Sequence, residues 1–251
     1  MTEQLPSPTA SEYYEQYWSA AGHCPTGYMY PDLERLLREY VAPGAQCLDV
    51  GCGDGRTAGL WLREYGRHYV GVDVSDNAIA EAQALGLDAR KISDASELPF
   101  PDRTFDAALS IEVFEHLFDP LATAREILRV LKPGGVLIAT VPNVAYWRRR
   151  LELVVGRWNP VGDDLSIEQP WRDPHVRFFT ASRLASMLEN AGYDGVNVSG
   201  HAGSFVRDLP WIGLKVWNRK TSRLYRWAQG RHPSVFGLRL NAVAFRPRAG
   251  R

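Results

Sequence analysis

Residues 48–55 read Leu48-Asp49-Val50-Gly51-Cys52-Gly53-Asp54-Gly55, an apolar strand that ends in an acid and leads into three glycines at every second position. The pattern predicts that Asp49 lies at the carboxyl end of a parallel sheet, where ligands of open α/β folds bind. Glycine lets the backbone pass close to a ligand because it has no Cβ. A dinucleotide fingerprint would need its third glycine at position 56, which is Arg56, and a phosphate loop would need Gly-Lys-Ser/Thr. The stretch therefore favours a ligand at this sheet edge other than a dinucleotide or the phosphates that a phosphate loop binds.

Two further acids follow the next two predicted strands. Asp73 ends an apolar run 24 residues after Asp49 and could accept hydrogen bonds from both hydroxyls of a ribose. The alternative, a helix cap at Asp73, is disfavoured because Ser75 or Asp76 already serves as that cap. Asp94 could accept a hydrogen bond from an adenine amine, or could simply be solvated in its loop. Three acids at successive strand ends favour an adenosine-containing ligand.

With these motifs the chain resembles the class I S-adenosylmethionine-dependent methyltransferases. The matching stretches, in the order and spacing of that family, are Asp49–Gly55, Asp73, Asp94–Asp102, Phe105-Asp106 and Leu131–Gly135. The resemblance covers residues 30–200 and implies a Rossmann-like α/β fold: a seven-stranded, mostly parallel sheet with helices on both faces and one antiparallel edge strand. It also implies S-adenosyl-L-methionine as the cofactor. The residues implied to hold it are Asp49, Gly51, Gly53, Asp73, Val74, Asp94, Ala95 and Ile111, with Glu112 near it.

Three later segments are similar to the MetW-like group of this family. They are Val141–Leu151, Gly156–Pro160 and His175–Thr180. The similarity raises an alternative to catalysis, a non-catalytic S-adenosylmethionine-binding partner of another enzyme.

Composition favours one soluble α/β domain. A chain of 251 residues with 45% hydrophobic content can build a large core. No window approaches the ~20 apolar residues that span a bilayer, and Met1–Ala10 lacks a basic-then-apolar signal, so we expect a cytoplasmic protein. Cys24, Cys47 and Cys52 lack metal-ligand spacing, and buried free thiols are expected rather than disulfides or zinc.

The apolar patterns alternate between strands and helices, which predicts parallel βαβ units. Strands are expected near 46–50, 68–73, 87–92, 105–111, 135–141, 195–199 and 238–245. Helices are expected near 11–20, 31–40, 55–65, 76–85, 120–131 and 180–191, and within 210–230. Together they predict a single methyltransferase domain over 1–251, with a helical lid in 1–42, a cofactor-binding core in 43–200, and a basic helical insertion and final strand in 201–251.

The candidate for catalysis is the run Glu112-Val113-Phe114-Glu115-His116, just after the fourth predicted strand. Methyl transfer from a sulfonium has a good leaving group, so the protein mainly aligns the nucleophile and excludes water. An oxygen nucleophile must also lose its proton, and histidine suits a general base near neutral pH. If the run is helical, Glu112, Glu115 and His116 share one face. His116 is the predicted base or orienting group, and a structural histidine bonded to a loop is the alternative.

A metal ligand is a third interpretation of His116. The chain is also similar to the ubiquinone-biosynthesis O-methyltransferases, whose Glu-x-x-Glu-His run can bind a divalent cation near the acceptor. Two carboxylates and an imidazole would suit such an ion. Because many relatives keep Glu-His here without a known metal role, no metal is predicted.

Aromatic residues before the first strand predict a lid, since in relatives this segment folds over the cofactor. The alternative is that these residues only pack against the sheet. The residues assigned to the lid or to the acceptor wall are Tyr14, Tyr17, Trp18, Tyr30, His175 and Arg177.

A formal net charge of zero conceals an uneven distribution. Residues 209–251 contain ten Lys and Arg and no Asp or Glu, whereas the first 208 residues hold 19 basic and 29 acidic side chains. The basic segment predicts either a solvated helix face, or contact with an anionic or carrier-linked acceptor or with a membrane surface through 211–231. No nucleic-acid recognition motif accompanies the charge, so no nucleic acid is expected. The sequence as a whole predicts a methyltransferase acting on an oxygen of a small molecule, such as a sugar, a phenol or a natural-product intermediate.

Overall fold

The computed structural model describes residues 12, 14, 15, 29–157, 175–201 and 219–248. The chain groups into two compact units. Unit 1 comprises residues 1–110 and 125–136, and unit 2 comprises residues 111–124 and 137–251. A single domain with three zones stays a prediction.

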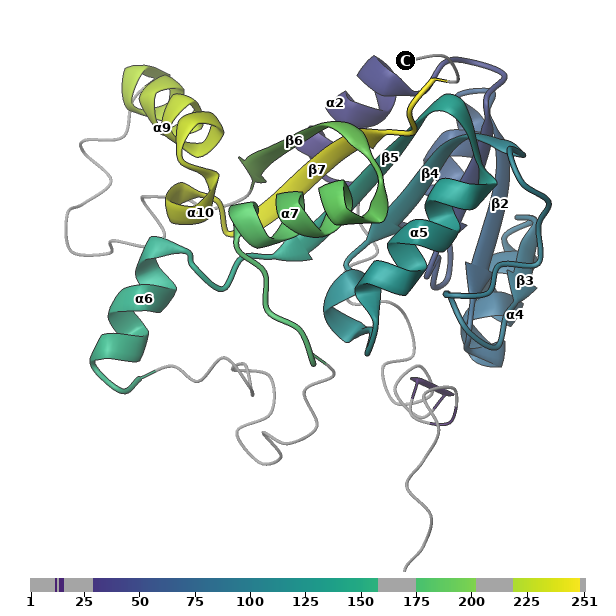
Figure 1. Ribbon diagram of the computed structural model, residues 1–251, viewed down its shortest axis with the longest axis horizontal. Helices are drawn as coiled ribbons and strands as arrows, with labels where there is room; N and C mark the ends of the chain where they lie inside the picture. Colours follow the sequence, from purple (N-terminus) through teal and green to yellow (C-terminus); the bar gives the residue numbers. More distant parts are fainter. Residues whose placement is uncertain (1–11, 13, 16–28, 158–174, 202–218, 249–251) are drawn as a thin grey trace, which may run out of the picture. The chain divides into compact units, whose positions relative to one another are not determined.

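Seven strands form one sheet in the order β3-β2-β1-β4-β5-β7-β6 (Figure 1). They are β1 (Gln46–Val50), β2 (His68–Asp73), β3 (Ala89–Lys91), β4 (Phe105–Ile111), β5 (Leu131–Pro142), β6 (Asp194–His201) and β7 (Arg239–Phe245). β1 pairs in parallel with β2 and with β4, and β2 pairs in parallel with β3. β6 and β7 pair antiparallel at one edge. The predicted α/β fold, mostly parallel with an antiparallel edge, is confirmed.

Two of the described helices begin at residues whose side chains cap them. The helices that the structure describes are α2 (Pro31–Tyr40), α3 (Gly59–Glu64), α4 (Asp76–Ala84), α5 (Pro120–Val130), α6 (Trp147–Val154), α7 (Ala181–Ala191), α9 (Arg219–Arg231) and α10 (Pro233–Phe236), with the 3₁₀ turn η1 (Phe114–His116). Ser75 caps α4, because its hydroxyl accepts from Ala78 N at 3.2 Å. Thr180 caps α7 in the same way. Gly192 ends α7 with a φ of 104°, which glycine adopts without strain.

Two helical segments differ from the sequence prediction. The helix expected over 55–65 begins only at Gly59, because Gly55 has a φ of 74° and Asp54 Oδ1 accepts from Arg56 N at 3.0 Å, which makes the preceding residues a turn. The helix α6 was not expected. None of its residues is buried, so it has no apolar face against a core from which helical periodicity could be recognised. None of the helices that the structure describes is long and apolar enough to cross a bilayer.

The interior of unit 1 is built around β1. Its last four residues, Cys47–Val50, are buried without alternation, as expected for a strand covered on both faces. Cys47 and Cys52 are buried free thiols, as predicted, and burial raises the pKa of Cys47 to about 12. Cys24 lies outside the described residues.

Candidate functional site

The acid Asp49 lies near the carboxyl end of β1, where it is 3% exposed. Tyr69, on the neighbouring strand β2, donates its hydroxyl to Asp49 Oδ2 at 3.2 Å. Burial raises the pKa of Asp49 to about 7, an effect that the Tyr69 hydrogen bond opposes and the charge of Asp73 reinforces. The side chain is thus poised to gain or lose a proton near neutral pH.

The glycines after β1 give the backbone a conformation that other residues rarely adopt. Gly51 has a φ of 71° and Gly53 a φ of 54°. This bend lets Gly53 N donate to Asp73 Oδ2 at 2.9 Å. The turn after β1 and the end of β2 are therefore linked through one carboxylate.

Asp73 ends β2 and is also buried, at 8% exposure. Its other oxygen accepts from Ser75 N at 3.0 Å, across the half-buried Val74. Burial raises the pKa of Asp73, while the backbone N–H groups of Ser75 and Gly53 oppose the rise. The structure therefore brings the first two predicted cofactor acids and both glycines together within unit 1. That they hold the cofactor stays a prediction.

The third acid, Asp94, lies in the loop after β3. Its carboxylate is exposed and accepts from Ser96 N at 2.7 Å, and the adjacent Ala95 is buried. This bond fixes the Asp94 carboxylate in a local turn. That Asp94 also accepts a hydrogen bond from an adenine amine stays a prediction.

A residue that the sequence did not indicate connects the amino-terminal segment to this region. Glu15 accepts from Ser75 Oγ and Asp76 N, both at 2.8 Å, and from Asn77 N at 3.2 Å. A carboxylate at a helix amino terminus is favoured by the free N–H groups and by the helix dipole. The half-buried Tyr14 is the sequence neighbour of Glu15, which contacts the amino terminus of α4. This helix begins directly after Ser75, close to Asp73. Tyr17 and Trp18 lie outside the described residues, and Tyr30 lies at the start of α2.

In unit 2, β4 ends at the half-buried Ile111, and residues 112–116 do not form one continuous helix. Glu112 has a φ of 57°, in the left-handed region, and only Phe114–His116 form a 3₁₀ turn. Thr140 Oγ1 donates to Glu112 Oε1 at 2.9 Å, and Arg239 Nε lies 3.3 Å from Glu112 Oε2. The condition under which Glu112 would share a helical face with Glu115 and His116 is therefore not met, because the 3₁₀ turn begins only after Glu112. Whether Glu112 lies near the cofactor stays a prediction.

Glu115, His116 and His175 form a cluster that joins two distant parts of the sequence. Val176 N and Arg177 N both donate to the Glu115 carbonyl, at 2.8 and 2.9 Å. The Glu115 carboxylate oxygen Oε1 lies 3.7 Å from His116 Nε2 and 4.0 Å from His175 Nε2. The centroids of the two imidazole rings lie 4.8 Å apart. Arg177 itself donates to the Phe118 carbonyl at 2.5 Å.

The electrostatics of this cluster are unusual. Glu115 is 1% exposed, and neither carboxylate oxygen has a hydrogen-bond partner in the described part of the chain. Burial, followed by the negative charge of Glu112, raises the pKa of Glu115 well above its ordinary value. One ligand atom from each of Glu115, His116 and His175 lies within 4.8 Å of the others, so the cluster could hold a proton or a metal ion. The sequence identified His116 and His175 separately, but no pattern in it paired them, and nothing in it indicated Thr140 or Arg239.

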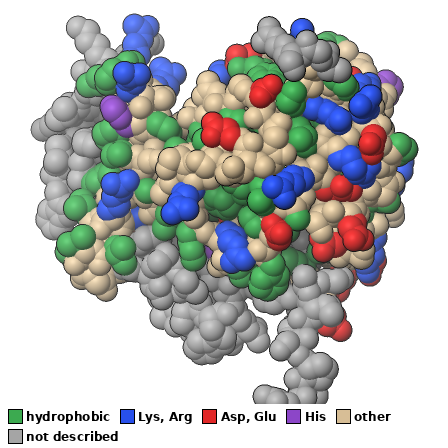
Figure 2. Space-filling model, viewed as in Figure 1, with side chains coloured by type: hydrophobic (Ala, Val, Ile, Leu, Met, Phe, Trp, Pro, Cys, Tyr) green, Lys and Arg blue, Asp and Glu red, His purple; other side chains and the backbone are tan. Residues whose placement is uncertain are grey.

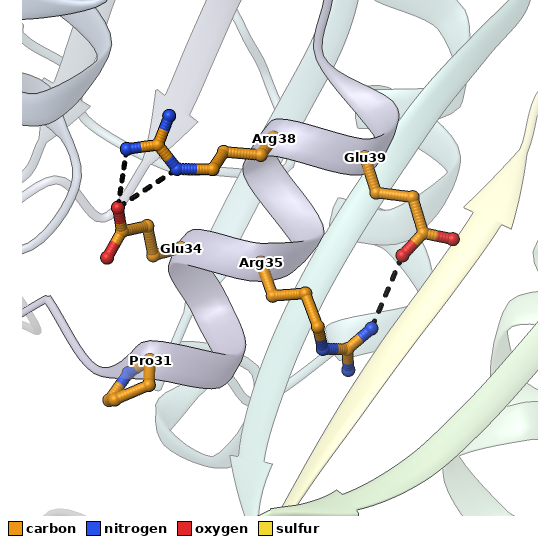
Figure 3. Close-up of a pocket in the computed structure, with 5 residues that line it drawn as sticks. All are labelled: Pro31, Glu34, Arg35, Arg38 and Glu39. Carbon is orange, nitrogen blue, oxygen red and sulfur yellow. Dashed lines mark hydrogen bonds and ion pairs between the residues drawn. The ribbon is translucent and has the colours of Figure 1, made fainter.

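Two surface hollows lie away from these groups. One, of about 430 Å³, is lined by Pro31, Glu34, Arg35, Arg38 and Glu39 on α2 (Figure 3). Its charges pair with each other, Arg38 with Glu34 at 2.7 Å and Arg35 with Glu39 at 3.3 Å. The other, of about 470 Å³, includes Gln46 and His68 at the amino ends of β1 and β2. Neither includes Asp49, Asp73 or His116 among its lining residues.

The comparisons with known proteins agree with one another. The family described as "Methyltransferase domain" matches residues 25–198. A probable S-adenosylmethionine-dependent methyltransferase of Mycolicibacterium smegmatis is 29% identical over 191 residues, which cover 67% of this chain and 67% of the relative. A ubiquinone biosynthesis O-methyltransferase of Dinoroseobacter shibae is 32% identical over 167 residues, which cover 62% of this chain and 63% of the relative. The chain thus matches 67% and 63% of the length of these two curated relatives.

A solved structure shows the same fold. Phosphoethanolamine N-methyltransferase 2 of Haemonchus contortus, in complex with phosphomonomethylethanolamine and S-adenosylhomocysteine, has a TM-score of 0.67 at 16% identity, over 96% of this chain and 61% of that chain.

Proposed function

Because the chain belongs to the S-adenosylmethionine-dependent methyltransferases, we propose that it methylates an oxygen of a small-molecule acceptor and that His116 removes the acceptor's proton. The acceptor would be a sugar, a phenol or a natural-product intermediate. The name of the Dinoroseobacter shibae relative, an O-methyltransferase, supports oxygen as the nucleophile.

S-adenosyl-L-methionine is the cofactor, and when bound it supplies the methyl group on a positively charged sulfur. The described residues of unit 1 suit this group. Asp49 and Asp73 provide two buried carboxylates at the ends of adjacent parallel strands, and Gly51 and Gly53 leave the backbone open between them. Carboxylates there would attract the positive charge and accept hydrogen bonds from ribose hydroxyls.

The observation that carries the catalytic proposal is the buried Glu115 carboxyl group beside His116 and His175. A carboxylate next to an imidazole stabilises the imidazolium that forms when the ring takes a proton. The positive charge on the ring would in turn favour the ionised form of Glu115, whose pKa is raised by burial. In the proposed reaction the acceptor's hydroxyl proton passes to His116 as the oxygen bonds to the methyl carbon. The bound S-adenosylmethionine would supply the methyl carbon, with a neutral thioether as its leaving group. His175 and Arg177 would line the acceptor side of the same cluster.

The acceptor is further proposed to be anionic or linked to a carrier. On α9 the exposed side chains include Arg223, Arg226 and Arg231, with Leu224 and Trp227 63% and 62% exposed among them. In Figure 2 the Lys and Arg side chains at the upper left lie beside hydrophobic ones without Asp or Glu among them, in accord with the lack of acids in 209–251. Such a face would attract a phosphorylated group or the acidic surface of a carrier.

The test is the variant His116→Gln, assayed by the release of S-adenosylhomocysteine with a panel of catechols and nucleotide sugars. If His116 is the base, kcat falls by about 10²–10⁴-fold, while the Kd for S-adenosylmethionine, measured by calorimetry, stays close to wild type. The control is His232→Gln, which changes an exposed histidine of the same unit. Unchanged kcat in His116→Gln would contradict the proposal. Activity lost on adding a chelator and restored by Mg²⁺ or Zn²⁺ would instead assign the cluster to a metal ion.

A further inference from the structure

We propose that Tyr69 is a positioning residue for the cofactor site, which holds the Asp49 side chain as an oriented carboxylate. The inference rests on the proposed role of Asp49 in binding the cofactor. Tyr69 itself would not touch the reacting atoms, and it acts through the 3.2 Å hydrogen bond from its hydroxyl to Asp49 Oδ2.

The register of the sheet explains how Tyr69 reaches this carboxylate. In the parallel pair of β1 and β2, Tyr69 lies opposite Cys47 and Gly71 lies opposite Asp49. Tyr69 and Gly71 are two residues apart and thus share a face of the sheet. The tyrosine side chain extends along the strand, over Gly71, to the residue two positions further on in β1.

Two glycines keep this path open. A Cβ placed on Gly71 would lie 2.5 Å from the Tyr69 hydroxyl oxygen. A Cβ placed on Gly59 of α3 would lie 2.8 Å from Tyr69 Cζ and 3.0 Å from the hydroxyl oxygen. Atoms cannot approach this closely without displacement, so side chains at either position would push the phenol away from Asp49. The space for the hydroxyl is therefore bordered by glycines of two separate elements, β2 and α3.

The charges around Asp49 show why such a donor matters. The carboxyl group of Asp73, at the end of β2, raises the pKa of Asp49 further. The thiol of Cys52 is buried, and burial raises its pKa well above the ordinary value, so Cys52 remains neutral. Tyr69 is the group that lowers the pKa of Asp49, which burial raises to about 7. Among the residues that the structure describes, no Lys or Arg pairs with Asp49 and one hydroxyl donates to it, so the carboxylate depends strongly on that donor.

The consequence concerns the pH range in which the cofactor binds. A positively charged ligand favours the ionised form of Asp49, so affinity should fall as pH decreases through the pKa of this group. Without the Tyr69 hydroxyl the pKa rises further, and the loss of affinity should occur at higher pH. The structural alternative, in which Tyr69 only fills space, predicts that the pH at which affinity is lost does not change.

The experiment compares the Kd for S-adenosylmethionine of wild type and Tyr69→Phe by calorimetry from pH 6 to pH 9. The cofactor's own amine titrates equally with both proteins, so the ratio of the two Kd values reports only on the protein. We expect the variant to bind roughly tenfold more weakly at pH 6, for the loss of one hydrogen bond to a charged group, and almost as tightly as wild type at pH 9. A ratio that does not change with pH, whether it is one or larger, would overturn the inference.

A matched control and a second variant keep the result interpretable. Tyr193 is also buried, and its hydroxyl donates to the Ala124 carbonyl at 3.0 Å in unit 2. Tyr193→Phe removes a comparable hydrogen bond and should leave the pH profile of binding at wild type. Asp49→Asn separates the two hypotheses. If it leaves affinity unchanged at every pH, Asp49 does not bind the cofactor and the proposed site is wrong; if it weakens binding while Tyr69→Phe does not, only the role of Tyr69 is wrong.

Discussion

At the scale of one residue, the buried Asp49, a proposed cofactor-binding group, should reduce the stability of the protein at neutral pH. Burial raises its pKa to about 7, above the ordinary value of an aspartate, so its contribution to the free energy of unfolding is favourable at low pH and is lost as pH rises through 7. Asp49→Asn keeps the shape and still accepts from Tyr69. We expect this variant to be more stable than wild type by roughly 1–3 kcal/mol at pH 8, and nearly equal to it at pH 4. Urea unfolding at the two pH values measures the difference, and an equal or lower stability of the variant at pH 8 would contradict it.

At the scale of elements, α5 holds the loop that follows β3. Arg129 donates to the carbonyls of Phe100 at 3.0 Å and Leu98 at 3.1 Å, and pairs with Asp102 at 2.6 Å, so one side chain fixes three loop positions. Arg129→Gln should lower the free energy of unfolding by about 1–2 kcal/mol, because two carbonyls lose a charged donor. The control Arg35→Gln removes exposed ion pairs with Asp32 and Glu39 and should cost less than about 1 kcal/mol. Chemical denaturation of both variants tests this, and equal effects would mean that the loop does not depend on Arg129.

At the scale of the whole molecule, charge is divided along the chain. If the basic carboxyl-terminal segment attracts an anionic acceptor, replacing Arg223, Arg226 and Arg231 with Gln should raise KM and remove most of its dependence on salt, while kcat stays close to wild type. Screening acts over about 8 Å at physiological ionic strength, so the wild-type KM should rise with added salt. The control replaces three exposed arginines of unit 1, Arg35, Arg63 and Arg90. If the KM of wild type and of the α9 variant depended on salt in the same way, the basic segment would have no role in attracting the acceptor. If wild type sedimented with anionic liposomes and the variant did not, the acceptor would be identified as lipid-borne.

Over the whole molecule, local parts of the candidate site could be predicted from the sequence, and parts that depend on distant residues could not. The ends of β1 and β2 were predictable, because a buried strand, an acid and alternating glycines are local features that few other structures require. The turn at Glu112 was not, because the left-handed backbone there is stabilised by Thr140 and Arg239, which are distant in the sequence. Likewise, His116 and His175 were each predicted separately as site residues, and their pairing was not. Their pairing depends on hydrogen bonds from the 175–177 segment to Glu115, and single-sequence patterns carry no information on such contacts.

The position of β1 inside the sheet also determines when its surroundings can form. Both of its neighbours come later in the chain, with Cys47 opposite Tyr69 on one side and opposite Ala107 on the other. Because synthesis proceeds from the amino terminus, β1 leaves the ribosome with its backbone groups unpaired on both sides. The shorter loop to β2 costs less entropy to close than the longer one to β4. The carboxylates of Asp49 and Asp73 can therefore meet early in folding, and pairing with β4 completes the central strand afterwards.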